Sequence, residues 1–234
     1  MSDAIVIASG GMDSATALFW SRRYQTESPL VLSFDYGQRH VKELSFAAEM
    51  CEHLGLEHQV VDLTGLQPLI ATSVLTDHTT EVPEGHYAQE NMKQTVVPNR
   101  NMIMLSIATG VAVARNSHSV IVGVHAGDHP VYPDCREGFI IDFELAAHTA
   151  NEGFLKENFR VIAPFVLMSK AEIVELGDDL GVPWELTWSC YKGGQHHCGR
   201  CATCVERLEA FDIAEIDDPT LYEDKEYWRT VVNS

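Results

Sequence analysis

Residues that could bind a phosphate group stand at the beginning of the chain. The apolar residues 5–8 are typical of a buried strand, and Gly10 and Gly11 then allow a tight turn that can approach a ligand closely. Asp13 or Ser14 can cap the helix that follows, and the first turn of a helix offers free N–H groups and a partial positive charge. The segment therefore predicts a phosphate-binding loop between a strand and a helix.

The run Ser-Gly-Gly-Met-Asp-Ser at residues 9–14 indicates the type of loop. A Walker-type loop requires Lys-Ser/Thr after its glycines, and no lysine follows here. The run instead resembles the pyrophosphate loop of the PP-loop ATP pyrophosphatases, which implies cleavage of ATP between its α and β phosphates, with AMP left on a substrate oxygen. The alternative is a glycine turn that only joins strand and helix. The resemblance implies that ATP contacts Ala8, Ser9, Gly10, Gly11, Met12, Asp13, Ser14, Ala15, Thr16, Ala17 and Leu18.

A second candidate site lies in the last quarter of the chain, where four of the six cysteines gather: Cys190, Cys198, Cys201 and Cys204. In a chain without an export signal such a cluster indicates a metal rather than disulfides. Four thiolates with two Cys-x-x-Cys spacings fit structural Zn²⁺ with no open coordination position, which would stabilise a tail too small for its own core. The alternatives are an iron–sulfur cluster, a site in which His196 or His197 replaces a cysteine, and a redox cysteine pair.

The bulk composition limits the partners. Acidic residues outnumber basic ones by 34 to 16, a net charge of −18, which argues against a nucleic-acid partner. The longest apolar stretch, residues 102–114, is too short to span a bilayer and indicates a buried helix that is apolar nearly all round. We therefore expect a cytoplasmic protein with neither a nucleic-acid nor a membrane partner.

The elements that must position these residues follow an alternating rhythm. Strands are expected at residues 5–8, 31–34, 58–61, 120–124 and 160–162. Helices are expected at residues 15–23, 41–54, 101–115, 137–151 and 170–180. This pattern predicts an α/β fold, a parallel five-stranded sheet with helices on both faces, and ligands at the carboxyl ends of the strands.

Three segments depart from that rhythm. Residues 65–98 contain three prolines among polar residues, so they are interpreted either as an active-site lid or as a disordered surface insertion. Residues 181–211 are expected to form a small subdomain around the cysteines. The acidic residues 212–234 predict a short terminal helix or a segment packed on a neighbouring subunit. The expected domains are therefore an ATP-binding domain, residues 1–180, and a zinc-binding C-terminal subdomain, residues 181–234.

Polar runs recur where strands end or helices begin, at residues 35–40, 98–101, 123–128 and 132–136. Each run alone could be a plain turn or a surface charge. Together they converge on the sheet edge where an α/β protein binds its ligands.

These runs, taken together, resemble the 7-cyano-7-deazaguanine synthase family of the queuosine and deazapurine pathways. The resemblance extends from about residue 4 to residue 211 and rests on residues 9–14, 34–40, 98–101, 132–136, 169–173 and 187–204. It implies an adenine nucleotide α-hydrolase-like fold, the substrates 7-carboxy-7-deazaguanine, ATP and ammonia, zinc on the four cysteines, and a homodimer. Residues 124–132 depart from the form found in many members, which leaves the final acceptor open.

The resemblance suggests a hypothesis for the mechanism. The acid attacks the α-phosphate of ATP, ammonia converts the adenylate to an amide, and a second adenylation leads to the nitrile. The expected catalytic residues are Ser9, Asp13, Arg100 and Lys170, with Asp13 ordering the loop or holding Mg²⁺ and the two cations neutralising phosphate charge. Lys170 could alternatively be a surface lysine at a helix start. The expected substrate-binding residues are Arg39, Asp128, Asp134 and Arg136.

Three rival interpretations remain at this level. A paralogue could adenylate the same carboxylate and couple it to another amine, such as one on a protein, stopping at the amide. A PP-loop enzyme could modify tRNA, although the negative charge disfavours an RNA partner. A nucleotide sensor could hold ATP without chemistry.

Overall fold

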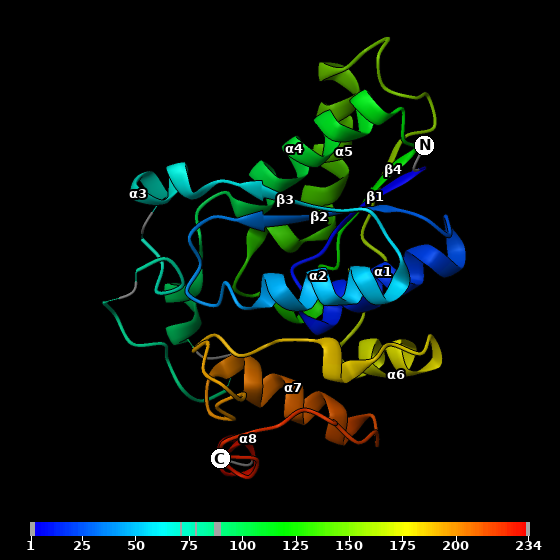
Figure 1. The fold of residues 1–234 in the computed structure, drawn as a ribbon. Coiled ribbons are helices and arrows are strands. Elements are labelled where there is room, and N and C mark those ends of the chain that lie inside the picture. Colours follow the sequence, from blue (N-terminus) through cyan, green and yellow to red (C-terminus); the bar gives the residue numbers. More distant parts are fainter. Residues whose placement is uncertain (1–2, 71, 78, 87–89, 233–234) are drawn as a thin grey trace.

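A five-stranded parallel sheet forms the centre of the molecule, in the order β3-β2-β1-β4-β5 (Figure 1). The computed structural model describes residues 3–70, 72–77, 79–86 and 90–232. All four strand pairs are parallel, as predicted, and the strands are β1 Ala4–Ile7, β2 Leu30–Asp35, β3 His58–Asp62, β4 Ser119–Ile121 and β5 Arg160–Ile162. Because β2 and β4 lie on opposite sides of β1, the sheet reverses its winding there. Such a reversal opens a crevice at the carboxyl end of the strands.

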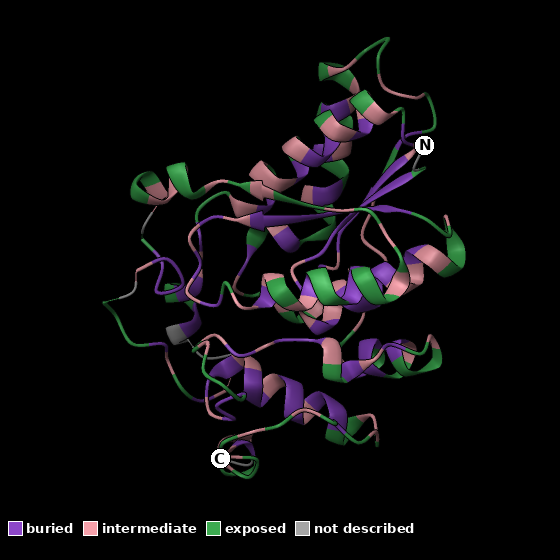
Figure 2. Ribbon diagram, viewed as in Figure 1, coloured by how far each residue is buried: buried purple, intermediate pink, exposed green. Residues whose placement is uncertain are grey.

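Helices cover both faces of the sheet, which confirms the predicted layers. Helices α1, Met12–Tyr24, and α2, Glu43–Leu54, lie on one face, and α4, Arg100–Arg115, and α5, Glu137–Ala150, on the other (Figure 1). Helix α6, Lys170–Asp179, packs beyond α1. Every residue of β1 is buried (Figure 2), as expected for a strand covered on both faces.

Helix α4 buries one face rather than its whole circumference. Leu105, Ala108 and Ala112 pack in the core beneath the sheet, whereas Met102 and Ser106 are exposed. The prediction of a buried helix, apolar nearly all round, therefore holds for this face only. Small residues make the stretch look uniformly apolar in sequence although only one stripe is covered.

The helical stretch Met92–Arg115 reaches the length and mean hydropathy, 1.2, of a membrane-spanning segment, which the sequence analysis did not expect. Length and composition alone are weak evidence, because core helices of soluble proteins meet the same criteria. In this fold α4 contacts strands β1 and β4.

The irregular segment that precedes α4 packs on the body of the protein in its described parts. It contains η1 Thr64–Leu66, α3 Gln67–Ile70 and η2 Glu90–Thr95. Leu75 and Met92 are fully buried in the main core, and the buried Thr95 hydroxyl hydrogen-bonds the Tyr132 hydroxyl. The described parts therefore do not form a loose surface insertion, while residues 71, 78 and 87–89 lie outside the described residues.

The C-terminal region contains η5 Trp184–Leu186, α7 Ala202–Ile213 and α8 Tyr227–Val232. The short terminal helix was predicted, but α7 was not. Arg207 is fully buried in α7, where it donates to both carboxylate oxygens of Asp218, each at 3.0 Å. A buried arginine interrupts the apolar period that reveals a helix in sequence. Ala210 and Phe211 pack in the core that contains Leu18, and the domain boundary at residue 180 stays a prediction.

Candidate active site

A cavity lies at the carboxyl ends of β1, β2 and β4, the edge that the sequence predicted. Its wall is built from the loop after β1, the ends of β2 and β4, the first residues of α4 and α6, and the cysteine-rich region. Six segments that are distant in sequence thus meet around one space. A cavity at this edge is where a doubly wound sheet binds its ligand.

The phosphate loop is shaped by Gly10 and Ser14. Gly10 has a φ of +96°, and a Cβ there would lie 2.1 Å from the carbonyl oxygen of Glu43, so no other residue fits without a shift. The Ser14 Oγ accepts from the backbone N–H groups of Ser9 (3.2 Å) and Gly10 (3.3 Å) and donates to the carbonyl of Gly11 (3.0 Å). These bonds close the loop into a compact turn.

Helix α1 begins at Met12, earlier than predicted, and its N-cap is Gly11. The expectation that Asp13 or Ser14 caps this helix was wrong, because both lie inside its first turn. No side chain of the described residues caps it. The first N–H groups of α1 are therefore left available for an anion in the cavity.

Lys170 connects the phosphate loop with the other acidic side chains of the cavity. Its Nζ lies 2.6 Å from the Asp13 Oδ2, 3.4 Å from a Glu206 carboxylate oxygen and 3.2 Å from the His125 Nε2. A capping box between Ser169 and Glu172 fixes the start of α6 and hence the position of Lys170. The side chain of Lys170 is only 14% exposed, so the alternative of a surface lysine was wrong.

These contacts shift the pKa values of the pair in opposite directions. Burial alone would raise the pKa of Asp13, but the Lys170 ammonium and His125 bring it below its ordinary value. Burial likewise opposes the charge on Lys170, yet Asp13 and Glu206 raise the pKa of Lys170. The Asp13 Oδ1 is buried and has no hydrogen-bond partner among the described residues. One oxygen of this carboxylate is therefore occupied and the other is free.

The opposite part of the cavity is aromatic. Arg100, the first residue of α4, lies among Tyr36, Tyr132 and Tyr191. Its guanidinium carbon is 5.9 Å from the centre of the Tyr132 ring. Burial raises the pKa of Tyr36 to about 12, so this hydroxyl is neutral at ordinary pH. Here one fixed cation stands between neutral rings.

Glu43 connects the two parts of the cavity. Burial is the main cause that raises the pKa of the Glu43 carboxyl to about 8, although Arg100 and hydrogen bonds from Gln38 and Ser9 oppose the rise. Its Oε1 lies 3.4 Å from the His40 Nε2, and burial lowers the pKa of His40 to about 3. Glu43 and His40 were not predicted as site residues.

The predicted substrate-binding residues separate into two groups. Asp128 lines the cavity, and its carboxylate lies 3.5 Å from the His125 Nε2. Asp134, Arg39 and Arg136 are not among the lining residues. The Asp134 carboxylate accepts from the backbone N–H of Asn101 (3.0 Å) and so fixes the start of α4. Their contact with substrate stays a prediction.

The two remaining arginines of that set are held by backbone carbonyls. The Arg39 guanidinium donates to the carbonyls of Asp77 (2.7 Å) and Thr80 (2.6 Å), which ties it to the irregular segment before α4. The exposed Arg136 donates to the carbonyl of His129 (2.9 Å).

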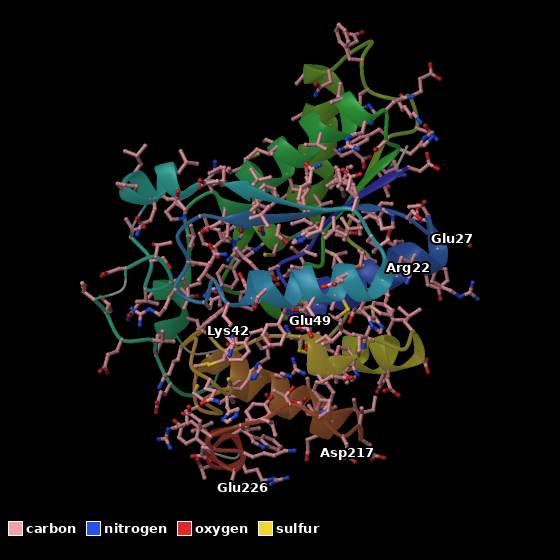
Figure 3. All side chains as sticks on the ribbon, viewed as in Figure 1. Arg22, Glu27, Lys42, Glu49, Asp217 and Glu226 are labelled. Carbon is pink, nitrogen blue, oxygen red and sulfur yellow. The ribbon has the colours of Figure 1, made fainter. Side chains whose placement is uncertain are left out.

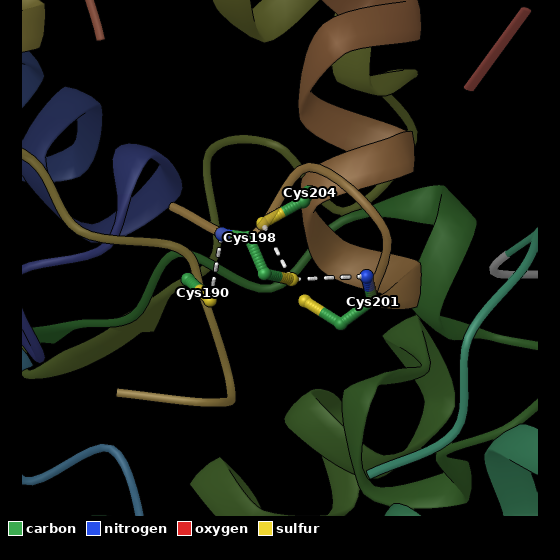
Figure 4. Close-up of side chains that lie close together, drawn as sticks. All are labelled: Cys190, Cys198, Cys201 and Cys204. Atoms are coloured by element: carbon green, nitrogen blue, oxygen red, sulfur yellow. Dashed lines mark hydrogen bonds between the residues drawn. The ribbon is translucent and has the colours of Figure 1, made fainter. Parts of the chain in front are cut away.

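The four clustered cysteines come together in space (Figure 4), and their sulfur atoms all lie within 4.8 Å of one another. The Cys198 and Cys204 sulfurs are 3.9 Å apart, close to the edge of about 3.8 Å of a tetrahedron with Zn–S bonds of about 2.3 Å. The backbone N–H groups of Arg200 and Cys201 point at the Cys198 sulfur. The donor set therefore fits a closed four-thiolate metal site.

His197 does not belong to this cluster. Its Nε2 accepts from the backbone N–H of Ser189 (3.0 Å), and its ring packs against Trp188 with the ring centres 4.2 Å apart and the ring planes tilted by 40°. The alternative in which His197 replaces a cysteine is not supported by this arrangement.

The cysteine region also forms a wall of the cavity, which sequence reasoning missed. The backbone N–H of Trp188 donates to the carbonyl of Gly10 (2.8 Å). Lys42, the N-cap residue of α2, donates to the carbonyls of Gly194 (2.9 Å) and Gln195 (3.0 Å); it is labelled in Figure 3. The residues that this region contributes to the cavity are Trp188, Ser189, Tyr191, Thr203 and Glu206. The sequence feature that could have pointed to these residues is their position next to the four cysteines.

The phosphate loop at the winding reversal of a parallel sheet defines a nucleotide-binding α/β protein of the PP-loop type. NMN synthetase from Francisella tularensis shares this fold, with a TM-score of 0.51 and 15% identity over 98% of this chain and 84% of that one. The chain belongs to the family described as queuosine biosynthesis protein QueC, whose model matches residues 3–215.

Relatives at about half identity cover nearly the whole chain. The 7-cyano-7-deazaguanine synthase of Brucella anthropi is 51% identical over 230 residues, 97% of each chain. The 7-cyano-7-deazaguanine synthase 1 of Mesorhizobium japonicum is 52% identical over 228 residues, 97% of this chain and 96% of that one.

Proposed function

We propose that the protein is a 7-cyano-7-deazaguanine synthase, an ATP-dependent carbon–nitrogen ligase of queuosine biosynthesis. The family and the relatives of that name support the assignment. One structural observation carries it: the phosphate loop and an aromatic wall, whose guanidinium forms no ion pair with a described carboxylate, line the same cavity. A nucleotide and a flat heterocyclic acid can therefore meet there.

The reaction begins with a carboxylate, which is a poor acyl donor because oxide is a poor leaving group. The carboxylate oxygen of 7-carboxy-7-deazaguanine attacks the α-phosphorus of ATP, the bond to the bridging oxygen breaks, and pyrophosphate leaves with the electron pair. Ammonia displaces AMP to give the amide. A second adenylation on the amide oxygen and loss of AMP give the nitrile.

The protein contributes positioning and charge. The uncapped N–H groups of the first turn of α1, with the Ser9 and Ser14 hydroxyls, hold the departing pyrophosphate, and Lys170 offsets its charge. We assign the partnerless Asp13 Oδ1 to Mg²⁺, which would neutralise phosphate charge when bound with ATP.

Asp128 is the acid that we assign to the guanine-like edge of the substrate, where a carboxylate can accept from a ring N–H and an amino group. Asp134 acts one step away, through the start of α4 and therefore through Arg100. Arg39 and Arg136 lie outside the lining of the cavity, and their assignment to substrate binding rests on the family resemblance alone.

We assign Zn²⁺ to the four cysteines as a structural ion, because four thiolates leave no coordination position for substrate. The assignment also includes a cytoplasmic homodimer with small-molecule substrates and no nucleic-acid partner. The excess of 34 acidic over 16 basic residues supports the last point.

Product analysis tests the proposal. The protein is incubated with ATP, Mg²⁺, ammonium and 7-carboxy-7-deazaguanine, and the products are identified by mass spectrometry. We expect the nitrile, with AMP and pyrophosphate. Release of ADP and phosphate alone would contradict attack at the α-phosphate, and an amide or a conjugate as final product would favour the paralogue that couples the acyl group to another amine.

A further inference from the structure

We propose that the Arg100 guanidinium binds the carboxylate of the heterocyclic acid, and that the tyrosines around it form the walls against the flat rings. The inference rests on the proposed function, whose first stage begins from that carboxylate. It gives Arg100 a role different from neutralising the phosphates of ATP.

Arg100 is a cavity-lining cation without an acidic partner. No carboxylate of the described residues lies within ion-pair distance of its guanidinium, and its neighbours are Tyr36, Tyr132, Tyr191 and Cys135. A positive charge that is taken out of water and left unpaired is costly. The missing partner is therefore expected from a ligand.

Arg207 shows what a structural arginine looks like in the same molecule. It is fully buried, it binds Asp218 through two hydrogen bonds of 3.0 Å, and it also donates to the Thr187 hydroxyl at 2.7 Å. All of these partners belong to the chain, and Arg207 does not line the cavity. Arg100 has the opposite arrangement, with cavity access and no carboxylate.

The titratable neighbours of Arg100 do not supply the missing charge. Burial raises the pKa of Tyr36 to about 12, so its hydroxyl stays protonated. Burial also raises the pKa of the more distant Glu43 to about 8, so this carboxyl is mostly protonated at neutral pH. Asp128 places negative charge near Tyr191 and Cys135, but none of the described carboxylates forms an ion pair with Arg100. An incoming carboxylate would therefore be the first ionic partner of this guanidinium among the groups described.

The other lining cation is already committed. Lys170 is paired with Asp13 and Glu206 at the phosphate end, where the free N–H groups of α1 also lie. Arg100 belongs to the aromatic end, and Glu43, which interacts with both Ser9 and Arg100, connects the two ends. An acid held by Arg100 would thus lie next to a nucleotide held by the loop.

The chemistry of the group fits this role. A guanidinium fork pairs with a planar carboxylate through parallel hydrogen bonds, and tyrosine rings provide flat surfaces for a bicyclic heterocycle. The two stages of the proposed reaction then differ. The first begins from an anion that pairs with Arg100, whereas the second begins from a neutral amide.

The test separates these stages. AMP formation by the Arg100→Gln variant is measured with the 7-carboxy acid plus ammonium and, separately, with the 7-carboxamide. We expect kcat/KM for the acid to fall on the order of 100-fold and that for the amide about 10-fold or less. Lys170→Gln is the matched control, because both stages use ATP and this variant should lower both rates equally.

The outcomes are distinct. An equal loss with acid and amide, or no loss with either, would overturn the role of Arg100. A wild-type protein that releases no AMP with the acid would instead overturn the proposed function. If Arg100→Gln does not fold by thermal melting, Arg100→Lys keeps the charge but not the fork, and the acid must again lose more than the amide.

Discussion

The phosphate loop and the cysteine-rich wall face each other across one cavity, but they hold their shape in different ways. The loop depends on contacts within six residues: a glycine with positive φ and a serine that binds its own backbone. The wall depends on distant partners, including a four-cysteine cluster, the Arg207–Asp218 pair and the Trp188–Gly10 hydrogen bond. One site can therefore join a half whose shape is encoded locally to a half that only the folded chain completes.

The largest effect is expected from Gly10→Ala, which breaks the local half. The new Cβ would meet the carbonyl of Glu43 at 2.1 Å in a backbone conformation with φ of +96°. We expect AMP formation to fall about 1000-fold or more, because a misplaced phosphate loop loses both binding and transition-state contacts. The rate of AMP release checks this.

Gly110→Ala is the matched control. A Cβ at Gly110, in the middle of α4, meets no atom within 4 Å, so the change should preserve activity and raise stability by up to about 1 kcal/mol. Full activity of Gly10→Ala would show that the loop is not built by the backbone of this glycine.

The next largest effect tests the distant half. Cys201→Ser removes one ligand from the cluster, and loss of a structural metal site costs several kcal/mol of stability. Since Trp188 donates to Gly10, we also expect the loop amides to exchange hydrogen faster in the variant. Metal analysis measures the loss of the ion, thermal melting the loss of stability, and hydrogen exchange the exposure of the loop amides.

Cys51→Ala offers the comparison for this variant. Cys51 is buried in α2, outside the cluster, so its replacement should leave the metal content unchanged. Unchanged protection of the loop amides in metal-free protein would mean that the two halves hold their shapes independently.

The features that could be predicted from the sequence are those encoded locally, whereas the features that depend on distant partners were missed. The strand positions and the loop could be predicted because apolar runs and a glycine turn are local patterns. Helix α7 was missed because Arg207 occupies a core position, and only its pairing with Asp218, eleven residues later, makes that burial tolerable. A partner outside the element leaves no periodic signal.

The candidate site shows the same limit. Asp13 and Lys170 were predicted from motifs, and the structure brings them within 2.6 Å. Glu206 and Tyr191 line the cavity but were not predicted, because their segment was interpreted only as a metal site. The cavity that they share with the loop exists only after the C-terminal region has folded back onto it.

Arg207→Gln should have a smaller effect than loss of the metal. It leaves the Asp218 carboxylate buried without its cation, and breaking such a pair costs about 3–5 kcal/mol. Arg229→Gln, which breaks exposed ion pairs at the surface, should have a much smaller effect, because water screens these pairs. Thermal melting compares the two variants. An equal loss of stability in both would contradict the role of the buried Arg207–Asp218 pair in holding the cysteine-rich wall.

The same pair predicts a pH dependence. Burial would raise the pKa of Asp218, but Arg207 lowers it from 3.8 to about 2. A lowered pKa stabilises the fold above pH 3.8, and this contribution is lost as the pH falls toward 2. In the Arg207→Gln variant the melting temperature should therefore fall less steeply as the pH is lowered from 3.8 to 2.

The last comparison concerns Glu43, which connects the loop with the aromatic part of the cavity and whose effect at a given pH is only a part of its full range. Folding raises the pKa of this carboxyl from 4.5 to about 8, mainly through burial, so the folded state binds the proton more tightly than the unfolded chain does. The contribution of the protonated carboxyl to the free energy of unfolding is fully present below about pH 4.5. It declines as the pH rises toward 8. Glu43→Gln cannot lose a proton, so its advantage in stability should grow by about 1 kcal/mol between pH 6 and pH 7 and level off above pH 8.

Glu49→Gln controls for loss of a charge from the same helix, because Glu49 is exposed on α2, where Figure 3 labels it. Melting both variants from pH 5 to pH 9 isolates the buried carboxyl. A stability difference that stays constant with pH for Glu43→Gln would mean that Glu43 is already ionised in the fold. Arg100 would then have a permanent counter-charge nearby, and its pairing with a substrate carboxylate would be correspondingly weaker. The melting profiles therefore test the electrostatic basis of the Arg100 proposal without using a substrate.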